Sequence, residues 1–313
     1  FLDLKFQYSI KGKHQGNINE FELFIKKFQP EVIHSHLFES EILLSLINYN
    51  QAKYIVHFHD NMPQLGKWQG KWSKSHIIHY IVRKRVLISY KKKDVIFVAI
   101  SNDTLSYIHK NLPKHSKSTL LFNAINRERF IEKEEVDRIP FSMVMIGSLV
   151  DKKNQQLAIK VLKWLRNEGY EFTLDLLGEG PNRLILQELI SSLGLDNYVK
   201  LHGNVDSPEN YLKSRQFYIH TATYEPFGLV LVEAMTSRIP IISIDGHGNR
   251  DLIKNGYNGI IEPNYSEKVI GEHIIRLIKD KEFTAKIIAN AFEFSKVYSI
   301  ENYALKLIEI YKH

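Results

Sequence analysis

Strand-length apolar runs alternate with helical patterns along the chain, and this alternation limits the fold more than any other feature of the sequence. The run at residues 95–100 is apolar at every position, which is typical of a parallel strand covered on both faces. In the first half, strands are expected at residues 31–36, 54–58 and 95–100, and helices at 19–28, 39–48 and 73–93. A parallel α/β sheet is therefore predicted.

The alternation restarts after residue 140 and predicts a second, doubly wound α/β domain. Residues 120–140 lose the apolar periodicity and gain charge, so the linker is placed there. We expect a first domain over residues 1–135, a second over 136–290 and a final helix over 291–313. In the second domain, strands are expected at 142–147, 171–177, 198–202, 216–222, 240–244 and 259–262, with helical patterns such as 154–167 and 182–193 between them.

The composition excludes several classes of protein. With 313 residues, 44% of them apolar, the chain can form two cores of ordinary size. It contains no Cys, which excludes disulfides and thiolate chemistry and favours a reducing cytosol. No apolar run reaches the length of about 18 residues that crossing a membrane requires. The chain starts at Phe1 inside a strand-like run, so we expect the N-terminal domain to be incomplete.

The stretch TATYEPFGLVLVEAMTSRIPII, residues 221–242, is the strongest candidate for a ligand site. Phe227, Gly228 and Leu229 would present backbone N–H groups at a helix start, where phosphate or sugar hydroxyls bind. Glu225 lies beside this start and Glu233 lies inside the helix, and a carboxylate can accept two hydrogen bonds from a vicinal diol such as ribose. Two Glu residues alone also fit a helix-dipole Glu followed by a solvated one.

Polar side chains follow three predicted strands of the first domain, at the edge where α/β sheets bind ligands. Residues i and i+2 on a strand share a face, so two His-x-His pairs could chelate a metal. We interpret them instead as polar residues that line a cleft, because the chain has neither Cys nor a D-x-D motif. The three segments are His34-Ser-His36, His57-Phe-His59-Asp60 and Ser101-Asn102-Asp103.

The dinucleotide fingerprint G-x-G-x-x-G is missing, since Arg183 stands where a third Gly would follow Gly178 and Gly180. A nicotinamide enzyme is therefore not expected. The loop at residues 147–154 instead carries Lys152 and Lys153 just before a helix start. These residues fit a diphosphate clamp, although two adjacent Lys residues are often only a solvated pair.

The string EPFGLVLVEAM followed by IPII resembles the E-x7-E signature of the retaining glycosyltransferases of family 4, which have the GT-B fold. The resemblance runs through nearly the whole chain. It implies two Rossmann-like domains facing across a cleft, and transfer of a sugar with retention from a nucleoside diphosphate sugar to a glycan or lipid-linked acceptor, as in bacterial surface polysaccharide synthesis. No metal or other cofactor is implied. Family members begin with a strand and a Gly-rich loop, and too few residues precede VIHSH to supply both.

The resemblance also implies roles for individual residues. Glu233 would hold the ribose, while Glu225 and the amides of residues 227–229 would face the donor sugar. VHFHD places His59 near that sugar. The family writes G-R-L-x-x-x-K where this chain has Lys153 at the Lys position and Ser148 at the Arg position. Catalytic roles are implied for Glu225, His59 and Lys153; donor contacts for Gly147, Ser148, Gly178, Gly203, Asn204, Phe227, Gly228, Leu229 and Glu233; and acceptor or cleft positions for His36, Asp60 and Ser101.

Two further segments resemble the family less closely. LFNAINRERF lies at the position of its P-N-G-x-D segment but lacks the Pro and the Gly. DGHGNRDLI resembles its diglycine loop, with His247 at one Gly position.

The positive charge is concentrated in the first half. Residues 1–139 carry a formal charge of +8 and residues 140–313 a charge of −1, and the densest basic part is residues 67–93. Cations interleaved with aromatics suit an anionic membrane face, which would make this cytoplasmic protein peripheral. Alternatively, the Ile residues of the helix expected at residues 73–93 pack on the sheet, and the cations of this helix are only solvated. No nucleic-acid motif is present. The candidate membrane residues are Trp68, Trp72, Arg83, Lys84 and Arg85.

Two other functions fit parts of the pattern. A nucleotide-sugar epimerase of the same fold would release free sugar from the donor alone. A non-catalytic relative that binds membranes or polyanions is suggested by Ser148 and by the start of the chain.

Overall fold

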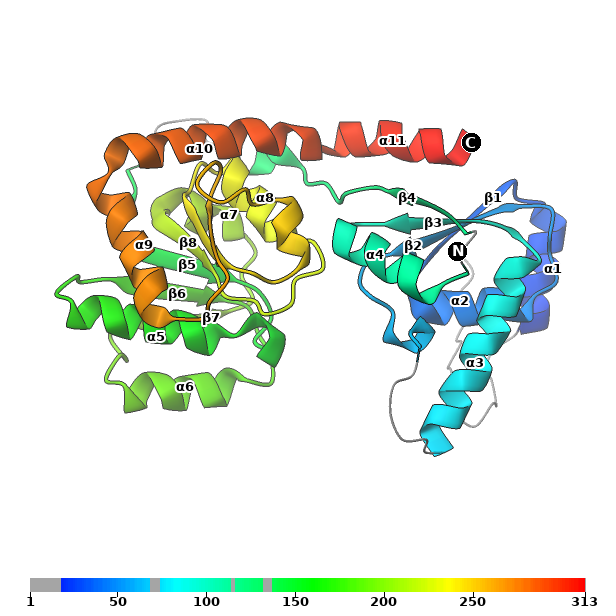
Figure 1. Cartoon of the computed structure of the whole chain (residues 1–313), viewed down its shortest axis with the longest axis horizontal. Helices are drawn as coiled ribbons and strands as arrows, with labels where there is room; N and C mark the ends of the chain where they lie inside the picture. Colours follow the sequence, from blue (N-terminus) through cyan, green and yellow to red (C-terminus); the bar gives the residue numbers. More distant parts are fainter. Residues whose placement is uncertain (1–17, 68–73, 114–115, 132–136, 313) are drawn as a thin grey trace. The chain divides into compact units, whose positions relative to one another are not determined.

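The chain forms two compact α/β units, seen here in a computed structural model that describes residues 18–67, 74–113, 116–131 and 137–312 (Figure 1). Unit 1 comprises residues 1–122 and 309–313, and unit 2 comprises residues 123–308. All strand pairings between the named strands of both units are parallel. Parallel strands need crossover connections, which the helices between them provide.

Unit 1 contains a four-stranded sheet in the order β1-β2-β3-β4. The strands are β1 (Val32–His36), β2 (Lys53–Phe58), β3 (Asp94–Ala99) and β4 (Lys117–Leu120), and the helices are α1 (Ile18–Phe28), α2 (Leu37–Leu46), α3 (Lys74–Lys91) and α4 (Asn102–Asn111). The sequence did not predict β4. Its residues, KSTL, form a half-polar edge strand without a buried position, so the apolar run that marks the other strands is missing.

Unit 2 contains a six-stranded sheet in the order β10-β9-β8-β5-β6-β7. The six strands that the sequence predicted are all present, each within three residues of its expected ends. The strands are β5 (Ile139–Ile146), β6 (Thr173–Leu177), β7 (Val199–Gly203), β8 (Arg215–His220), β9 (Ile241–Ile244) and β10 (Ile260–Glu262); the helices are α5 (Gln155–Asn167), α6 (Arg183–Ser192), α7 (Pro208–Ser214), α8 (Leu229–Thr236), α9 (Glu267–Lys279) and α10 (Lys281–Ser295).

Each unit has its own hydrophobic core. In unit 2, α5 buries one face through Leu157, Val161 and Leu165 against strands whose side chains are buried on both faces, such as those of β9. Burying one such side chain contributes about 1.5–3 kcal/mol, so the strand ends that carry the site rest on a rigid sheet.

The units divide between residues 122 and 123, earlier than the expected boundary at residue 135. The last helix, α11 (Ile300–Lys312), begins in unit 2, and its final residues belong to unit 1. There the hydroxyl of Tyr311 lies 2.8 Å from Nδ1 of His34, and Lys53 Nζ donates to the Tyr311 carbonyl. The start of the chain, expected to lack a strand and a Gly-rich loop, lies outside the described residues.

Candidate active site

The candidate site of unit 2 lies where the strand order of its sheet reverses. β5, β6 and β7 follow one another toward one edge, whereas β8, β9 and β10 follow one another toward the other, so β5 and β8 are neighbours. The connections that leave the carboxyl ends of β5 and β8 therefore diverge, and at such a switch point open α/β sheets bind ligands in a crevice. These connections are residues 147–154 and 221–228, the loops that the sequence singled out.

Lys153 and Glu225 form a mostly buried ion pair between these two loops. Lys153 ends the short 3₁₀ helix η3 (Asp151–Lys153), and its Nζ lies 2.5 Å from Glu225 Oε2. Their side chains are only 17% and 9% exposed. Lys153 is therefore not the solvated residue that a Lys pair often contains, whereas Lys152 is exposed.

His220, the last residue of β8, is a further partner of Glu225 that the sequence did not predict. It is fully buried, and its Nε2 lies 3.3 Å from Glu225 Oε2. Burial alone would raise the pKa of Glu225, but His220 and Lys153 outweigh it and lower that pKa to about 2. The carboxylate is therefore charged at neutral pH. The available signal was a polar residue at the end of an apolar strand, RQFYIH.

Hydrogen bonds between backbones hold the loops of this crevice together. Thr223 N donates to Lys152 O at 2.9 Å, which joins the loop after β8 to the loop after β5. Glu225 N donates to Gly246 O, and Gly248 N donates to Glu225 O, which joins the loop after β8 to the loop after β9. Glu225 is thus positioned by three loops that are far apart in sequence.

Helix α8 begins directly after this loop. Gly228 precedes the helix with φ at 101°, a left-handed conformation that disfavours any residue with a Cβ. Because α8 follows β8 in the chain, its first N–H groups lie at the edge of the sheet where the parallel strands have their carboxyl ends. The Phe227 side chain is buried and packs near the ring of Tyr298.

Glu233 lies on α8 in a partly buried position. Burial raises its pKa to about 7; Arg129 opposes this shift and Glu209 adds to it. Arg129 Nη2 itself lies 2.9 Å from Glu209 Oε2. Arg129 lies in the segment that was predicted to be the linker, and its interaction with Glu233 was not predicted; the charged run NRER was the signal available in the sequence.

Three glycines, Gly147, Gly178 and Gly203, lie at the carboxyl ends of β5, β6 and β7. Gly147 N donates to Leu177 O, and Gly178 N donates to Gly203 O at 2.8 Å. A Cβ on Gly178 would lie 2.2 Å from the Gly147 carbonyl oxygen, so this close approach requires glycine. The other predicted donor residues, Ser148 and Asn204, are exposed beside these strand ends.

His247 adopts a strained backbone where the resembled family has glycine. Its φ of 72° and ψ of −82° lie in a region that costs a non-glycine residue about 1–3 kcal/mol. His247→Gly is expected to raise the free energy of unfolding by about 1 kcal/mol, because strain relief exceeds the entropic cost of glycine, about 0.5–1 kcal/mol. Urea unfolding measures this. His247→Ala keeps the Cβ and should show no gain; a less stable Gly variant would contradict the strain.

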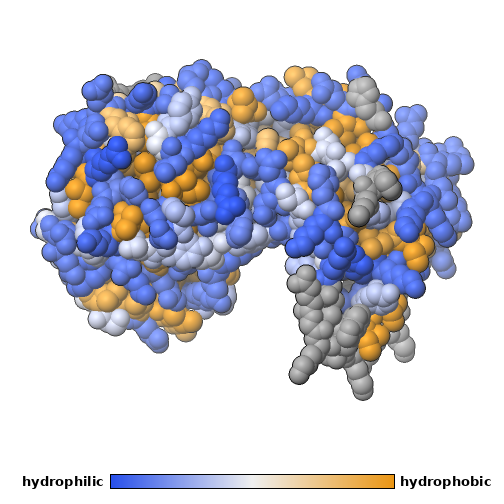
Figure 2. Space-filling view, viewed as in Figure 1, coloured by the Kyte–Doolittle hydropathy of each residue, from blue (hydrophilic) through white to orange (hydrophobic). Residues whose placement is uncertain are grey.

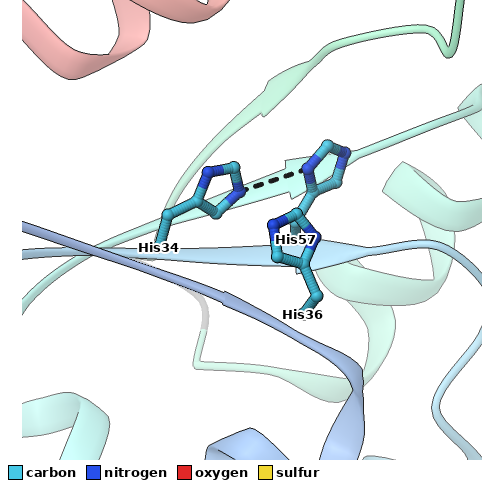
Figure 3. Close-up of side chains that lie close together, drawn as sticks. All are labelled: His34, His36 and His57. Carbon is cyan, nitrogen blue, oxygen red and sulfur yellow. Dashed lines mark hydrogen bonds between the residues drawn. The ribbon is translucent and has the colours of Figure 1, made fainter. Parts of the chain in front are cut away.

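Unit 1 gathers four histidines toward the carboxyl ends of β1 and β2, and Figure 3 shows three of them, His34, His36 and His57. His34 Nε2 lies 3.2 Å from His57 Nδ1, and His36 Nδ1 lies 2.7 Å from His59 Nε2. Burial and the neighbouring imidazoles lower the pKa of His57 to about 2 and that of His34 to about 4. The imidazoles are therefore neutral at physiological pH. The sequence predicted the cluster's place but not these contacts.

The other two cleft residues of unit 1 have local partners. Ser101, expected to face the cleft, is fully buried, and its hydroxyl accepts a hydrogen bond from Thr104 N as the N-cap of α4. The structure thus gives Ser101 a helix-capping position. Asp60 is partly buried and accepts a hydrogen bond from Asn61 N.

Two parallel-sheet Rossmann-like units, one with a polar crevice at its switch point, define the GT-B class of fold, and comparison with solved structures confirms this fold. Anabaena HepE, solved in complex with UDP, superposes with a TM-score of 0.78 at 18% identity, covering 94% of this chain and 81% of HepE. The glycosyl transferases group 1 family matches residues 126–294, and the chain belongs to this family.

Two curated relatives are similar in sequence to part of this chain. The poly(glycerol-phosphate) alpha-glucosyltransferase of Bacillus subtilis is 31% identical over 52% of this chain and 24% of the relative. The GtfA subunit of the UDP-N-acetylglucosamine--peptide N-acetylglucosaminyltransferase of Streptococcus agalactiae is 31% identical over 56% of this chain and 37% of the relative. The matches thus span less than half the length of these relatives.

Proposed function

We propose that the chain transfers a sugar, with retention, from a nucleoside diphosphate sugar to a glycan or lipid-linked acceptor, as a member of glycosyltransferase family 4. The observation that carries this proposal is the Lys153–Glu225 pair at the switch point beside the start of α8. It combines a cation, a carboxylate and helix N–H groups in one crevice. The names of the relatives, which include UDP-dependent and polymer-glycosylating enzymes, support a UDP-sugar donor and a role at the bacterial surface.

The residues of unit 2 supply what departure of a nucleoside diphosphate needs. As the bond between the anomeric carbon and the diphosphate oxygen breaks, negative charge develops on that oxygen. The Lys153 ammonium and the N–H groups at the start of α8 stabilise it. The acceptor hydroxyl attacks the anomeric carbon from the same face, and its proton passes to the departing diphosphate. No protein nucleophile is needed, and no metal is assigned a role.

The other residues position the donor in this proposal. Glu233 accepts hydrogen bonds from the ribose hydroxyls, for which its carboxylate must be ionised. Glu225 orients the sugar and holds Lys153 in place before the diphosphate arrives.

Nucleotide binding tests the proposal directly. Thermal unfolding of the chain is measured with UDP, GDP, ADP and CMP, each with and without an attached sugar. We expect UDP and UDP-sugars to stabilise it, by about 2.7 kcal/mol when the ligand is at 100 times its dissociation constant. Stabilisation by none of them would overturn the proposal. Incubation with the UDP-sugar alone separates transfer from epimerisation, because an epimerase would release free sugar without an acceptor.

We also propose that helix α3 docks on an anionic membrane surface. Ile77, Ile81 and Ile88 are each between 44% and 59% exposed, so they do not pack on the sheet. Figure 2 shows this hydrophobic surface beside hydrophilic residues. A groove of about 690 Å³ beside them is lined by cations that include Lys84, Arg85 and Lys92. None of the described helices is long and apolar enough to cross a bilayer.

Two of the predicted membrane residues can be placed in this surface, and three cannot. Lys84 and Arg85 are exposed. The Arg83 guanidinium donates to the carbonyls of Leu65 and Asn111, which gives it a structural role inside the unit. Trp68 and Trp72 lie outside the described residues.

Replacing Lys84 and Arg85 together with Gln is expected to weaken binding to phosphatidylserine vesicles about 30-fold at low salt. Each basic residue near such a surface contributes about 1 kcal/mol, and 1.4 kcal/mol is a factor of ten. Vesicle cosedimentation measures this. Lys268→Gln with Lys279→Gln removes two exposed charges from unit 2 and should have little effect. An equal loss of vesicle binding in the two double variants would contradict docking through α3. Vesicle binding that survives high salt would contradict it as well.

A further inference from the structure

Four imidazoles project from one face of the sheet in unit 1, and the register explains why. His36 of β1 stands opposite His57 of β2 in the parallel pairing. Alternate residues of a strand share a face, so His34 joins His36 and His59 joins His57. The rings lie in contact, with centroids 4.3 Å apart for His34 and His36 and 4.4 Å apart for His57 and His59.

We propose that His34, His36 and His57 form a binding site for a divalent transition-metal ion of the zinc type, each residue supplying one ring nitrogen. Candidate ligand atoms of the three residues all lie within 4.8 Å of one another. The 3.2 Å between His34 Nε2 and His57 Nδ1 is close to the edge of a zinc–nitrogen tetrahedron, about 3.3–3.4 Å. The His36 ring is exposed and lies beside the other two rings (Figure 3).

The surroundings of the three rings support a ligand there. The Tyr311 hydroxyl lies 2.8 Å from Nδ1 of His34, an outer partner of the kind that orients metal-bound histidines and leaves Nε2 for the metal. The Nε2 atom of His57 is buried and has no hydrogen-bond partner among the described residues. A buried polar atom left unpaired is costly, and a metal ion would match this one if His57 coordinated through Nε2 instead of Nδ1.

The donor set selects the metal. Imidazole nitrogens suit Zn²⁺, Cu²⁺ and Ni²⁺, whereas Mg²⁺ and Ca²⁺ prefer oxygen ligands. His36 is exposed, which gives the ion a path of entry and leaves a fourth position for water or for His59.

Cobalt serves as the spectroscopic probe, and zinc as its competitor. The chain, freed of any His tag and of bound metal by a chelator, is titrated with Co²⁺ at pH 7.5. We expect visible absorption of four-coordinate cobalt that saturates at one equivalent and disappears when Zn²⁺ is added, whereas Mg²⁺ has no effect. Binding needs no nucleotide sugar, so the result does not depend on the proposed function. Absence of saturable binding would overturn the proposal and leave the cluster as stacked imidazoles only.

Two variants locate the site. His34→Gln and His36→Gln each remove one ligand and are expected to weaken zinc binding by at least about 100-fold. His36 is exposed, so its variant should fold, which circular dichroism checks. His109→Gln is the matched control, because His109 is an exposed histidine of the same unit that is hydrogen-bonded to Ser118. Unchanged affinity in both site variants, or equal loss in the control, would place the metal elsewhere.

Discussion

Replacing Lys153 with Met is expected to lower the free energy of unfolding by about 3–5 kcal/mol at pH 7, because the charged Glu225 stays buried without its cation. The same change should weaken UDP binding by about 10- to 150-fold, since a charge-assisted hydrogen bond contributes about 1.5–3 kcal/mol. Urea unfolding and calorimetry measure the two effects. Lys152→Met is the matched control: Lys152 is exposed, and its loss should cost less than about 1 kcal/mol.

A double variant separates stability from binding. Adding Glu225→Gln to Lys153→Met removes the unpaired charge, so it should restore much of the lost stability while UDP affinity stays low. If the double variant is no more stable than Lys153→Met, the ion pair does not explain the loss.

Acid titration tests the same pair. In the folded chain the pKa of Glu225 is about 2, below its ordinary value of 4.5. The resulting stabilisation is therefore fully present above about pH 4.5 and is lost as the pH falls toward 2. A shift of this size corresponds to about 3 kcal/mol. We expect the Lys153→Met variant to lose less stability than the wild type over this pH range.

Glu233→Gln is expected to stabilise the chain and weaken nucleotide binding at once. Burial raises the pKa of Glu233 from 4.5 to about 7, so the folded chain binds a proton that the unfolded chain releases. Wild-type stability therefore falls as the pH rises from about 4.5 to 7, by up to about 3 kcal/mol. Gln carries no such charge, so the variant should be more stable by that amount at pH 8 and equally stable at pH 4.

The binding effect has the opposite sign. Loss of the carboxylate acceptor should weaken UDP binding by about 1–3 kcal/mol, because the ribose hydroxyls lose a charge-assisted partner. Calorimetry at pH 8 measures this, and Glu188→Gln, an exposed residue of α6, is the control for both effects. An unchanged UDP dissociation constant would remove Glu233 from the ribose site. An unchanged free energy of unfolding at pH 8 would contradict the burial of a charged Glu233 carboxylate.

Local patterns in the sequence were sufficient for most of the strands and for the loops of the site. The apolar runs predicted nine of the ten strands, because a parallel strand covered on both faces needs apolar residues at nearly every position. The loops after β5 and β8 were recognised from Gly228, Lys153 and the two Glu residues, since a helix start and its preceding turn are encoded within a few residues. The edge strand β4 was not predicted, because a half-exposed strand has no such apolar run.

Contacts within the site depended on the tertiary structure alone. Lys153 and Glu225 are 72 positions apart and meet only because β5 and β8 are neighbours in the sheet, an order that no local window contains. The same holds for Arg129 beside Glu233, for Arg83 on two backbone carbonyls, and for Ser101 as a helix cap. The sequence determined which residues end each strand; the pairing and register of the strands decided which of those residues touch, because hydrogen bonding between strands is non-local.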